Sequence, residues 1–183
     1  MDAVTGKPLN IFVTHPDPYQ SSKVLPDKHI VKMPLECCQM LSIVASEKWG
    51  HGFGHLPRKD GTPYKTDHGA FRNHPCTIWA SEFVNNWQWL ISHGLALCSE
   101  YEARYNKVHS CLPTLQVAKS IFPHGDPTGR SGKDTTPFVR AMPDEFKLDT
   151  SISTFDAYKM YISSKPWVSS NYKRLPSRKP DWV

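Results

Sequence analysis

The sequence lacks the features of a membrane or secreted protein. No apolar run approaches the roughly 18 residues that a membrane span requires. The opening stretch, MDAVTGKPLNIFV, has no charged segment followed by an apolar one, so it does not resemble a signal peptide. We therefore expect a cytoplasmic protein without membrane contact. The 183 residues, 39% of them hydrophobic, suffice for one domain that buries roughly 70% of its unfolded surface.

Disulfide, nucleotide-loop and metal signatures are also missing. The five cysteines are odd in number and form no CxxC pair, so we expect buried free thiols and not a disulfide framework. There is no Walker loop, no GxGxxG motif and no GxSxG motif. His51 and His55 in HGFGH have a metal-like spacing, but no matching cysteines follow them. We expect neither a metal nor another cofactor.

Helical periodicity is what the sequence does contain. Apolar residues recur at helical spacing from Ile30 to Val44, and again without a break from Trp79 to Tyr101. Shorter helices are expected at 112–122 and 153–165, with a short strand or extended segment at 10–13. The prediction is a mainly α protein, a single compact helical domain around a long central helix of roughly eight turns.

The boundaries of these elements follow from prolines, glycines and capping residues. Asp27, just after Pro26, is the expected N-cap of the first long helix, and Pro34 either kinks that helix or begins a second one. The segment THPDPYQSS predicts a turn, and 50–72 and 123–146 predict loops. One domain should span 1–183, with an N-terminal extension at 1–9 and a basic, aromatic tail at 166–183.

One face of the first long helix carries a charged stripe. His29, Lys32 and Glu36 fall within about 60° of one another at helical spacing. Apolar neighbours raise the pKa of a glutamate and a nearby lysine lowers it, so Glu36 is a candidate for acid–base chemistry. The alternative is a structural Lys32–Glu36 ion pair, worth about 0.3–0.5 kcal/mol at a surface.

Further cations flank the predicted central helix. Arg72 and His74 precede its start, where backbone N–H groups favour anions, although a simple capping turn explains them equally well. Arg104, Lys107 and His109 lie at its end, where the helix dipole alone favours cations. The net charge of +5 permits a polyanionic partner without demanding one. Basic residues dominate from Lys159 onward, either as a solvated tail or as a phosphate-contacting one.

Several blocks of the sequence resemble known proteins. DKHIVKMPLECCQML, the long run that begins NHPCTIW, and TPFVRAMPDEFK are similar to a family of tailed-phage proteins from about Asn10 to Trp182. The chain also resembles the pyrimidine-dimer DNA glycosylases of the endonuclease V type, whose first helix carries D-x-H and a catalytic Glu seven residues after the His. Asp27, His29 and Glu36 match that spacing, while SEYEARYN and KPDW resemble the end of the second helix and the tail.

The resemblance implies an enzyme that acts at an N-glycosidic bond of DNA or a nucleotide, with Glu36 and His29 as catalytic residues. The binding residues would be Lys28, Lys32, Arg72, His74, Arg104, Lys107 and His109. In those glycosylases a terminal α-amine attacks the sugar C1′ and the Glu assists. Here nine residues precede Asn10, and Leu35 stands where that family has an arginine, so we expect water as the nucleophile.

A non-catalytic role is the alternative. A phage protein that binds nucleic acid or a nucleotide, for example a sponge for a host defence signalling nucleotide, would use the same cations with aromatic stacking. Turnover separates this reading from an enzyme. A protein-binding role, such as inhibition of a host protein, would need an exposed aromatic patch. The expected location is the cytoplasm, that of the host cell if the chain is phage-encoded, and a homo-oligomer is compatible with the sequence.

Overall fold

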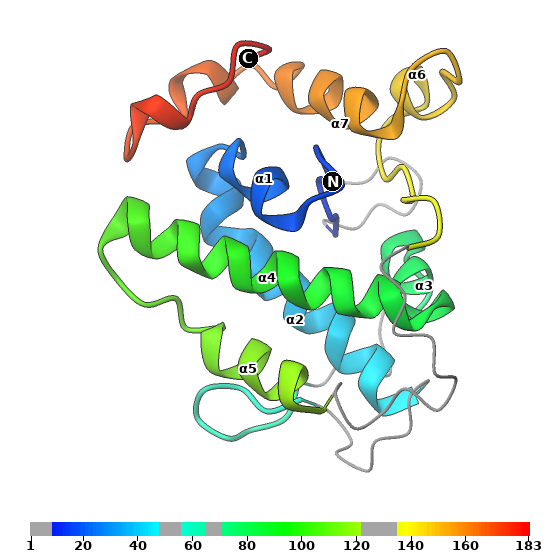
Figure 1. Ribbon diagram of the computed structural model, residues 1–183, viewed down its shortest axis with the longest axis vertical. Coiled ribbons are helices and arrows are strands. Elements are labelled where there is room, and N and C mark those ends of the chain that lie inside the picture. The colour runs from blue at the N-terminus through cyan, green and yellow to red at the C-terminus, as the bar shows by residue number, and fades with distance from the viewer. Residues whose placement is uncertain (1–8, 48–55, 65–70, 122–134) are drawn as a thin grey trace.

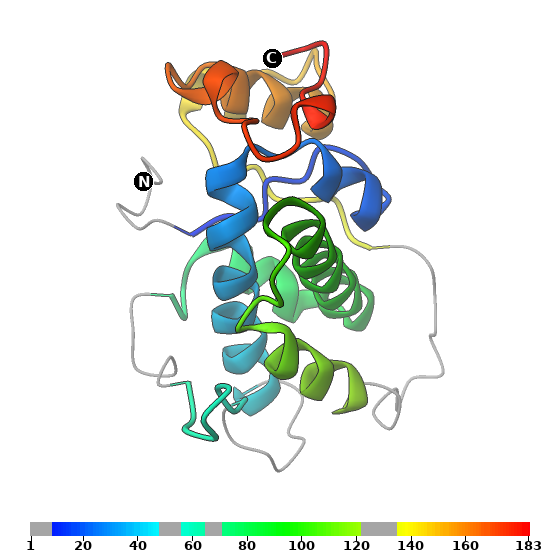
Figure 2. The same cartoon turned by 90° about the vertical axis from the view of Figure 1, so that its left-hand side faces the viewer.

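Two long helices cross at the centre of the computed structural model, which describes residues 9–47, 56–64, 71–121 and 135–183. They are α2 (Asp27–Glu47) and α4 (Val84–Tyr105) (Figure 1). The elements that pack around them are α1 (Pro18–Lys23), α3 (Pro75–Glu82) and α5 (Leu112–Ile121). A C-terminal layer covers α1 and the N-terminal end of α2 (Figures 1 and 2), and it consists of α6 (Asp144–Lys147), α7 (Thr154–Ser163) and the 3-10 turns η2 (Val168–Ser170) and η3 (Pro176–Arg178).

The predicted helical class is confirmed, and of the two forms expected for 10–13, a short strand or an extended segment, the structure shows the extended segment. This segment is buried and extended without pairing to another strand in the described residues. Its backbone is bonded by side chains instead, because Asn10 Oδ1 accepts from the N–H groups of Ile11 (2.8 Å) and Phe12 (3.0 Å). Asn10 Nδ2 donates to the carbonyl of Ala141 at 2.7 Å. Together with the bond from the Asn10 N–H to Glu36, this contact holds the segment between α2 and the chain just before α6.

The entry into α2 differs from the prediction in two details. The expected turn around Pro18 is the helix α1, since Asp17 caps it through the N–H groups of Tyr19 and Gln20. Asp27 is the first helical residue and not the N-cap, and its carboxylate bonds elsewhere. Beyond it α2 continues as a single helix through Pro34.

The predicted central helix is divided into α3 and α4 by Phe83, whose backbone is extended (φ −151°, ψ 142°). In a continuous helix the Trp79 carbonyl would accept from the Phe83 N–H. Here it accepts from Asn86 Nδ2 at 2.8 Å. Asn86 is held in turn by Thr136, through bonds of 2.7 and 2.9 Å. The expected long central helix is confirmed as α4, but its expected extent is wrong. The chain breaks at Phe83, and the contacts between Asn86 and Thr136, 50 positions later, hold the break.

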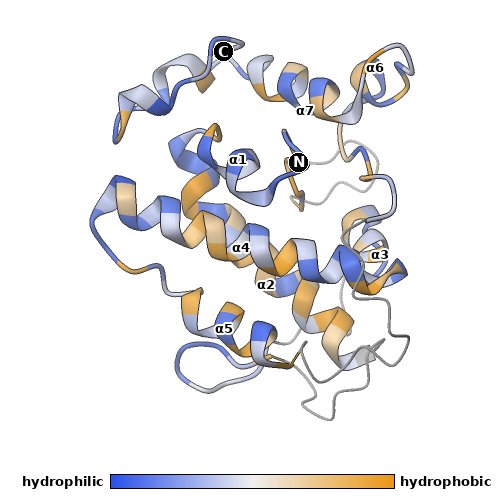
Figure 3. Cartoon of the chain, in the orientation of Figure 1, coloured by the Kyte–Doolittle hydropathy of each residue, from blue (hydrophilic) through white to orange (hydrophobic). Residues whose placement is uncertain are grey.

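The core lies where α2, α4 and α5 meet, and these helices carry much of the apolar surface (Figure 3). Gly94 lets α4 and α5 approach closely, because a Cβ at this position would lie 2.6 Å from Leu115 Cδ2 on α5. All five cysteines are buried free thiols, as predicted. The helices predicted at 112–122 and 153–165 are α5 and α7. Among the described residues, no helix is long and apolar enough to cross a membrane.

Candidate active site and nucleic-acid interface

Glu36 is a buried carboxyl group on the charged stripe of α2. Only 4% of the residue is exposed. Its Oε1 accepts a hydrogen bond from the Asn10 backbone N–H at 2.8 Å, and its Oε2 lies 4.0 Å from Lys32 Nζ. Burial raises the pKa of Glu36 to about 8, against the opposing effects of Lys32 and the Asn10 N–H. At neutral pH this group is therefore mostly protonated and can donate a proton.

His29 lies on the same face, buried between aromatic rings. It stacks on Phe12 with centroids 4.1 Å apart and meets Trp167 edge-on at 5.7 Å. Burial, with Lys165, Lys32 and Lys28 nearby, lowers the pKa of His29 to about 3. Its Nδ1 has no hydrogen-bond partner in the described part of the chain. His29 is thus a neutral imidazole that can position a ligand without supplying charge.

Phe12 reaches His29 through an unusual backbone conformation. Its φ is +40°, a region that residues with a side chain rarely occupy. The bond from the Phe12 N–H to Asn10 Oδ1 helps to hold this conformation. Strained backbone is often found at functional sites. Here the strained residue is Phe12, whose ring stacks on His29 and whose near neighbour Asn10 bonds Glu36.

Cations border this aromatic group on its outer side. Lys28 Nζ lies 4.3 Å from the centroid of Trp167, and Lys165 Nζ lies 4.4 Å from that of Tyr161. Lys28 and Lys32 are exposed, and the Lys32 side chain keeps 55% of its surface. Burial lowers the pKa of Lys165. The result is a positive surface beside a buried acid, which suits a phosphate-bearing ligand.

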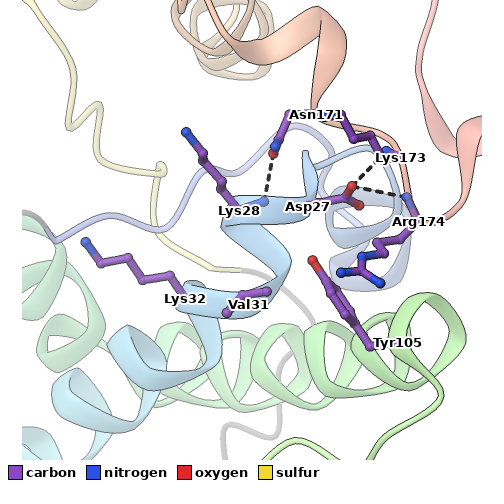
Figure 4. A pocket seen from close by; sticks show the side chains of 8 residues that line it. All are labelled: Asp27, Lys28, Val31, Lys32, Tyr105, Asn171, Lys173 and Arg174. Carbon is purple, nitrogen blue, oxygen red and sulfur yellow. Dashed lines mark hydrogen bonds between the residues drawn. The ribbon is translucent and has the colours of Figure 1, made fainter.

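A pocket of about 500 Å³ opens beside Lys28 and Lys32 (Figure 4). It lies between the start of α2, the end of α4 and the segment 171–174. Its lining residues are Asp27, Lys28, Val31, Lys32, Tyr105, Asn171, Lys173 and Arg174. Asn171 fixes the segment, since it accepts from the Asp27 N–H through its carbonyl and from the Lys28 N–H through Oδ1, both at 2.8 Å. Lys32 thus borders both the pocket and Glu36.

The predicted binding residues at the end of α4 have different surroundings. Arg104 has a fully buried side chain that bonds Glu100 and Asp27, so it stabilises the interior. His109 is also buried, and its Nε2 lies 2.9 Å from the Val31 carbonyl. Lys107 is exposed. Of these three, Lys107 alone presents its charge at the surface.

At the start of α3, His74 is completely buried and caps the helix, since its Nδ1 accepts from the Cys76 N–H at 3.1 Å. Arg72 is exposed two residues earlier. The metal-like pair His51 and His55 lies outside the described residues. Within the described residues, no group of three or more His, Cys, Asp or Glu side chains could hold a metal ion.

Sequence reasoning missed several residues of this region. Asn10 and Phe12 gave no signal, because their roles come from a buried backbone N–H and a strained φ. Lys165, Trp167 and Arg174 belong to the basic C-terminal stretch, so their charge was visible and their destination was not. The structure brings Lys28, His29, Lys32 and Glu36 together, whereas it gives Arg72, His74, Arg104, Lys107 and His109 other neighbours.

Taken together, the fold and this site define a helical protein with a buried acid beside a cationic, aromatic surface. The family model for pyrimidine dimer DNA glycosylase matches residues 9–113, more than half of the 183 residues. The chain belongs to the pyrimidine dimer DNA glycosylase family. The match includes Asn10, His29 and Glu36 and ends before α7, so the resemblance of the tail stays a prediction, as does a phage origin. No curated protein and no solved structure matches the chain.

Proposed function

We propose that this protein hydrolyses the N-glycosidic bond of a damaged pyrimidine in DNA, with Glu36 as the proton donor. The observation that carries the proposal is the Glu36 carboxyl group, which is 4% exposed, has a pKa of about 8 and adjoins a cationic surface. Membership of the pyrimidine dimer DNA glycosylase family supports the substrate class. An acid with a pKa near the working pH is well suited to proton transfer.

The chemistry needs one water molecule and no redox partner. Glu36 protonates the leaving pyrimidine while the C1′–N1 bond breaks, and a water oxygen bonds to C1′. The proton lost by that water restores the Glu36 acid. The products are an abasic sugar with a C1′ hydroxyl and a pyrimidine that, in a cyclobutane dimer, stays joined to its partner base. His29, neutral and held between Phe12 and Trp167, orders the aromatic side of the site, and Lys28 and Lys32 contact phosphate. The enzyme must also take the base out of the stack.

The nucleophile follows from the contact between Glu36 and Asn10. The Asn10 nitrogen lies 2.8 Å from Glu36 Oε1, which is where an attacking amine would be useful. This nitrogen is a peptide N–H joined to Leu9, so it cannot attack a sugar. Water is therefore the nucleophile in the proposed reaction.

The test uses a duplex oligonucleotide with one cyclobutane pyrimidine dimer, and an undamaged duplex as substrate control. We expect an abasic site at the dimer, detected as an alkali-labile strand break under single-turnover conditions. Its rate of formation should fall as the pH rises above about 8 and should drop at least about 100-fold in Glu36→Gln at unchanged DNA affinity. Glu102→Gln, an exposed carboxylate on α4, serves as the matched control. Bound lesion DNA that wild type never cleaves would overturn the proposal.

Borohydride trapping tests the nucleophile separately. The full chain should give no covalent adduct with lesion DNA, whereas a variant that begins at Asn10 should give one, because it places an α-amine beside Glu36. An adduct with the full chain would refute water as the nucleophile while leaving the role of Glu36 open to the first test.

Binding without turnover is the second candidate function. It is favoured by the pocket of about 500 Å³ and its cations, a size that suits a nucleotide. A protein of this kind would release its ligand unchanged on denaturation and would bind it equally well after Glu36→Gln.

A further inference from the structure

The pocket between α2, α4 and segment 171–174 has a fixed wall. Asp27 Oδ2 accepts from the backbone N–H groups of Lys173 (2.8 Å) and Arg174 (3.2 Å), and Asn171 bonds the first turn of α2. These bonds set the backbone, so the side chains of Lys173 and Arg174 are left to line the pocket (Figure 4). A site whose wall is already ordered loses less entropy on binding.

The pocket carries uncompensated positive charge. Four cations line it, and Asp27 is its single acidic lining residue. Asp27 is already engaged by Arg104 and by two backbone N–H groups. In the described ranges, no carboxylate lies within 4.0 Å of a side-chain nitrogen of Lys28, Lys173 or Arg174. The chemistry of the pocket therefore favours an anion.

The shape of the cation arrangement favours phosphate over a small ion. The Arg174 guanidinium lies 4.8 Å from the centroid of Tyr105, which holds it at the edge of the pocket. A planar guanidinium binds two phosphate oxygens at once, and flanking lysines add point charges. A cavity of about 500 Å³ accommodates a nucleotide unit and not merely a single ion.

The position of the pocket relative to Glu36 sets a distance. Lys28 and Lys32 line the pocket, and Glu36 lies eight and four residues later on α2, which is about 12 and 6 Å along the helix axis. One strand of B-DNA advances about 3.4 Å per nucleotide. The pocket thus lies about two to four nucleotides from the reacting sugar, with Lys32 at its near end.

From these observations we propose that the pocket binds a phosphate of the DNA strand about two to four nucleotides to one side of the damaged base. The inference rests on the proposed DNA-directed function and extends it by naming a second anchoring point. The chemistry that is recognised is a nucleotide phosphate, and its two sources are a phosphodiester within DNA and the monoester of a free nucleotide. We assign the strand phosphodiester, because Lys32 lines the pocket and also lies 4.0 Å from Glu36.

The experiment combines protein variants with shortened DNA. Affinity is measured for a duplex with about six base pairs on each side of a pyrimidine dimer, and for duplexes cut to about one base pair on either side. For wild type, removal of one particular flank should weaken binding about tenfold, and removal of the other should not. For Lys173→Gln/Arg174→Gln, the full duplex should bind about tenfold more weakly, with a salt slope lower by about 1 to 2, and the sensitive flank should no longer matter.

Lys179→Gln is the matched control, because Lys179 is an exposed cation of the same tail that does not line the pocket. It should retain the flank effect. Equal flank effects in wild type and the double variant would overturn the inference. Binding of thymidine 5′-monophosphate that needs Arg174, without any flank effect, would also overturn the strand assignment and identify a free nucleotide as the ligand.

The two proposals fail separately. A flank effect without abasic-site formation would keep this inference and reject glycosidic chemistry. Abasic-site formation by a protein without a flank effect would keep the chemistry and reject the pocket as a strand site. The control variant Lys179→Gln changes neither the pocket nor Glu36, so its single-turnover rate at saturating DNA should stay within about twofold of wild type.

Discussion

Helix α2 carries two buried carboxylates, Asp27 and Glu36, in opposite environments. Asp27 accepts a charged hydrogen bond from Arg104 and two backbone N–H groups from the C-terminal segment. Glu36 accepts one backbone N–H, from Asn10, and has one exposed lysine at 4.0 Å. Both residues are about equally buried, at 6% and 4% exposure. Burial alone therefore does not determine what a carboxylate does.

The difference lies in how completely each charge is compensated. Asp27 accepts from Arg104 on α4 and from two backbone N–H groups of segment 171–174, and these bonds tie α2 to both. Burial raises the pKa of Glu36 to about 8, because the Asn10 N–H and Lys32 offset only part of the cost of desolvating an ionised group. A buried acid kept protonated at neutral pH costs stability that a structural residue would not. That cost makes sense at a site that transfers a proton.

The largest effect is expected from removing the cation at the fully compensated carboxylate. Arg104→Met leaves Asp27 and Glu100 without their buried partner and also leaves the carbonyls of Leu25 and Lys23 without a donor. Losing one partner of a buried ion pair costs about 3–5 kcal/mol. Denaturant unfolding should show this loss in the free energy of unfolding.

Arg178→Met is the matched control for that measurement. Arg178 also bonds Glu100, at 2.7 Å, but its side chain is 32% exposed. Its removal should cost about 1 kcal/mol or less. If the two variants lost equal stability, the buried network around Asp27 would not be the anchor of the C-terminal segment.

Neutralising the two carboxylates should change the free energy of unfolding in opposite directions, and each change should be smaller than that of Arg104→Met. Because burial raises the pKa of Glu36 from 4.5 to about 8, the folded state binds more protons than the unfolded state between these values, and stability falls as the pH rises through them. Glu36→Gln removes this penalty. It should stabilise the protein by about 2 kcal/mol at pH 8–9, with a gain that shrinks toward pH 5.

Asp27→Asn is the corresponding change at the other carboxylate. It removes the charge that faces Arg104 and places an amide near the N–H groups of Lys173 and Arg174, so it should destabilise the protein at neutral pH. Thermal or denaturant unfolding across pH 5–9 measures both variants. A destabilising Glu36→Gln at pH 8–9 would mean that Glu36 is held ionised as a structural ion pair.

The sequence predicted one of these environments better than the other. Spacing alone placed His29, Lys32 and Glu36 on one face of a helix, and it indicated that apolar neighbours would raise the pKa of Glu36. The contribution of Asn10 was not predictable, because it is a backbone N–H 26 residues away. Composition showed a basic C-terminal stretch and could not show that Lys165 approaches His29 or that Arg174 lines a pocket.

The errors share this physical origin. The break at Phe83 depends on Thr136, which holds Asn86 from 50 residues away. Likewise, Arg104 follows the helix-dipole rule in sequence, yet its main partners come from 77 to 81 residues earlier. Local periodicity predicted where most helices lie, whereas partners that are distant in sequence decide which polar groups are buried and compensated.

The smallest effect is expected at the exposed partner of Glu36. Lys32→Met removes the cation that lowers the pKa of Glu36, so this pKa should rise further above 8, by a few tenths of a unit because the Lys32 side chain is 55% exposed and screened. Carboxyl NMR of Glu36, with salt varied, measures the shift, which should shrink as the salt concentration increases. Lys28→Met is the matched control, because Lys28 lies one helical turn before Lys32 and two turns before Glu36. It should leave the pKa of Glu36 unchanged. A fall in the pKa of Glu36 in Lys32→Met would mean that the loss of the Lys32 side chain exposes Glu36 to water, and that this exposure outweighs the loss of the positive charge. Solvent exposure, and not the number of hydrogen-bond donors, would then distinguish Glu36 from Asp27.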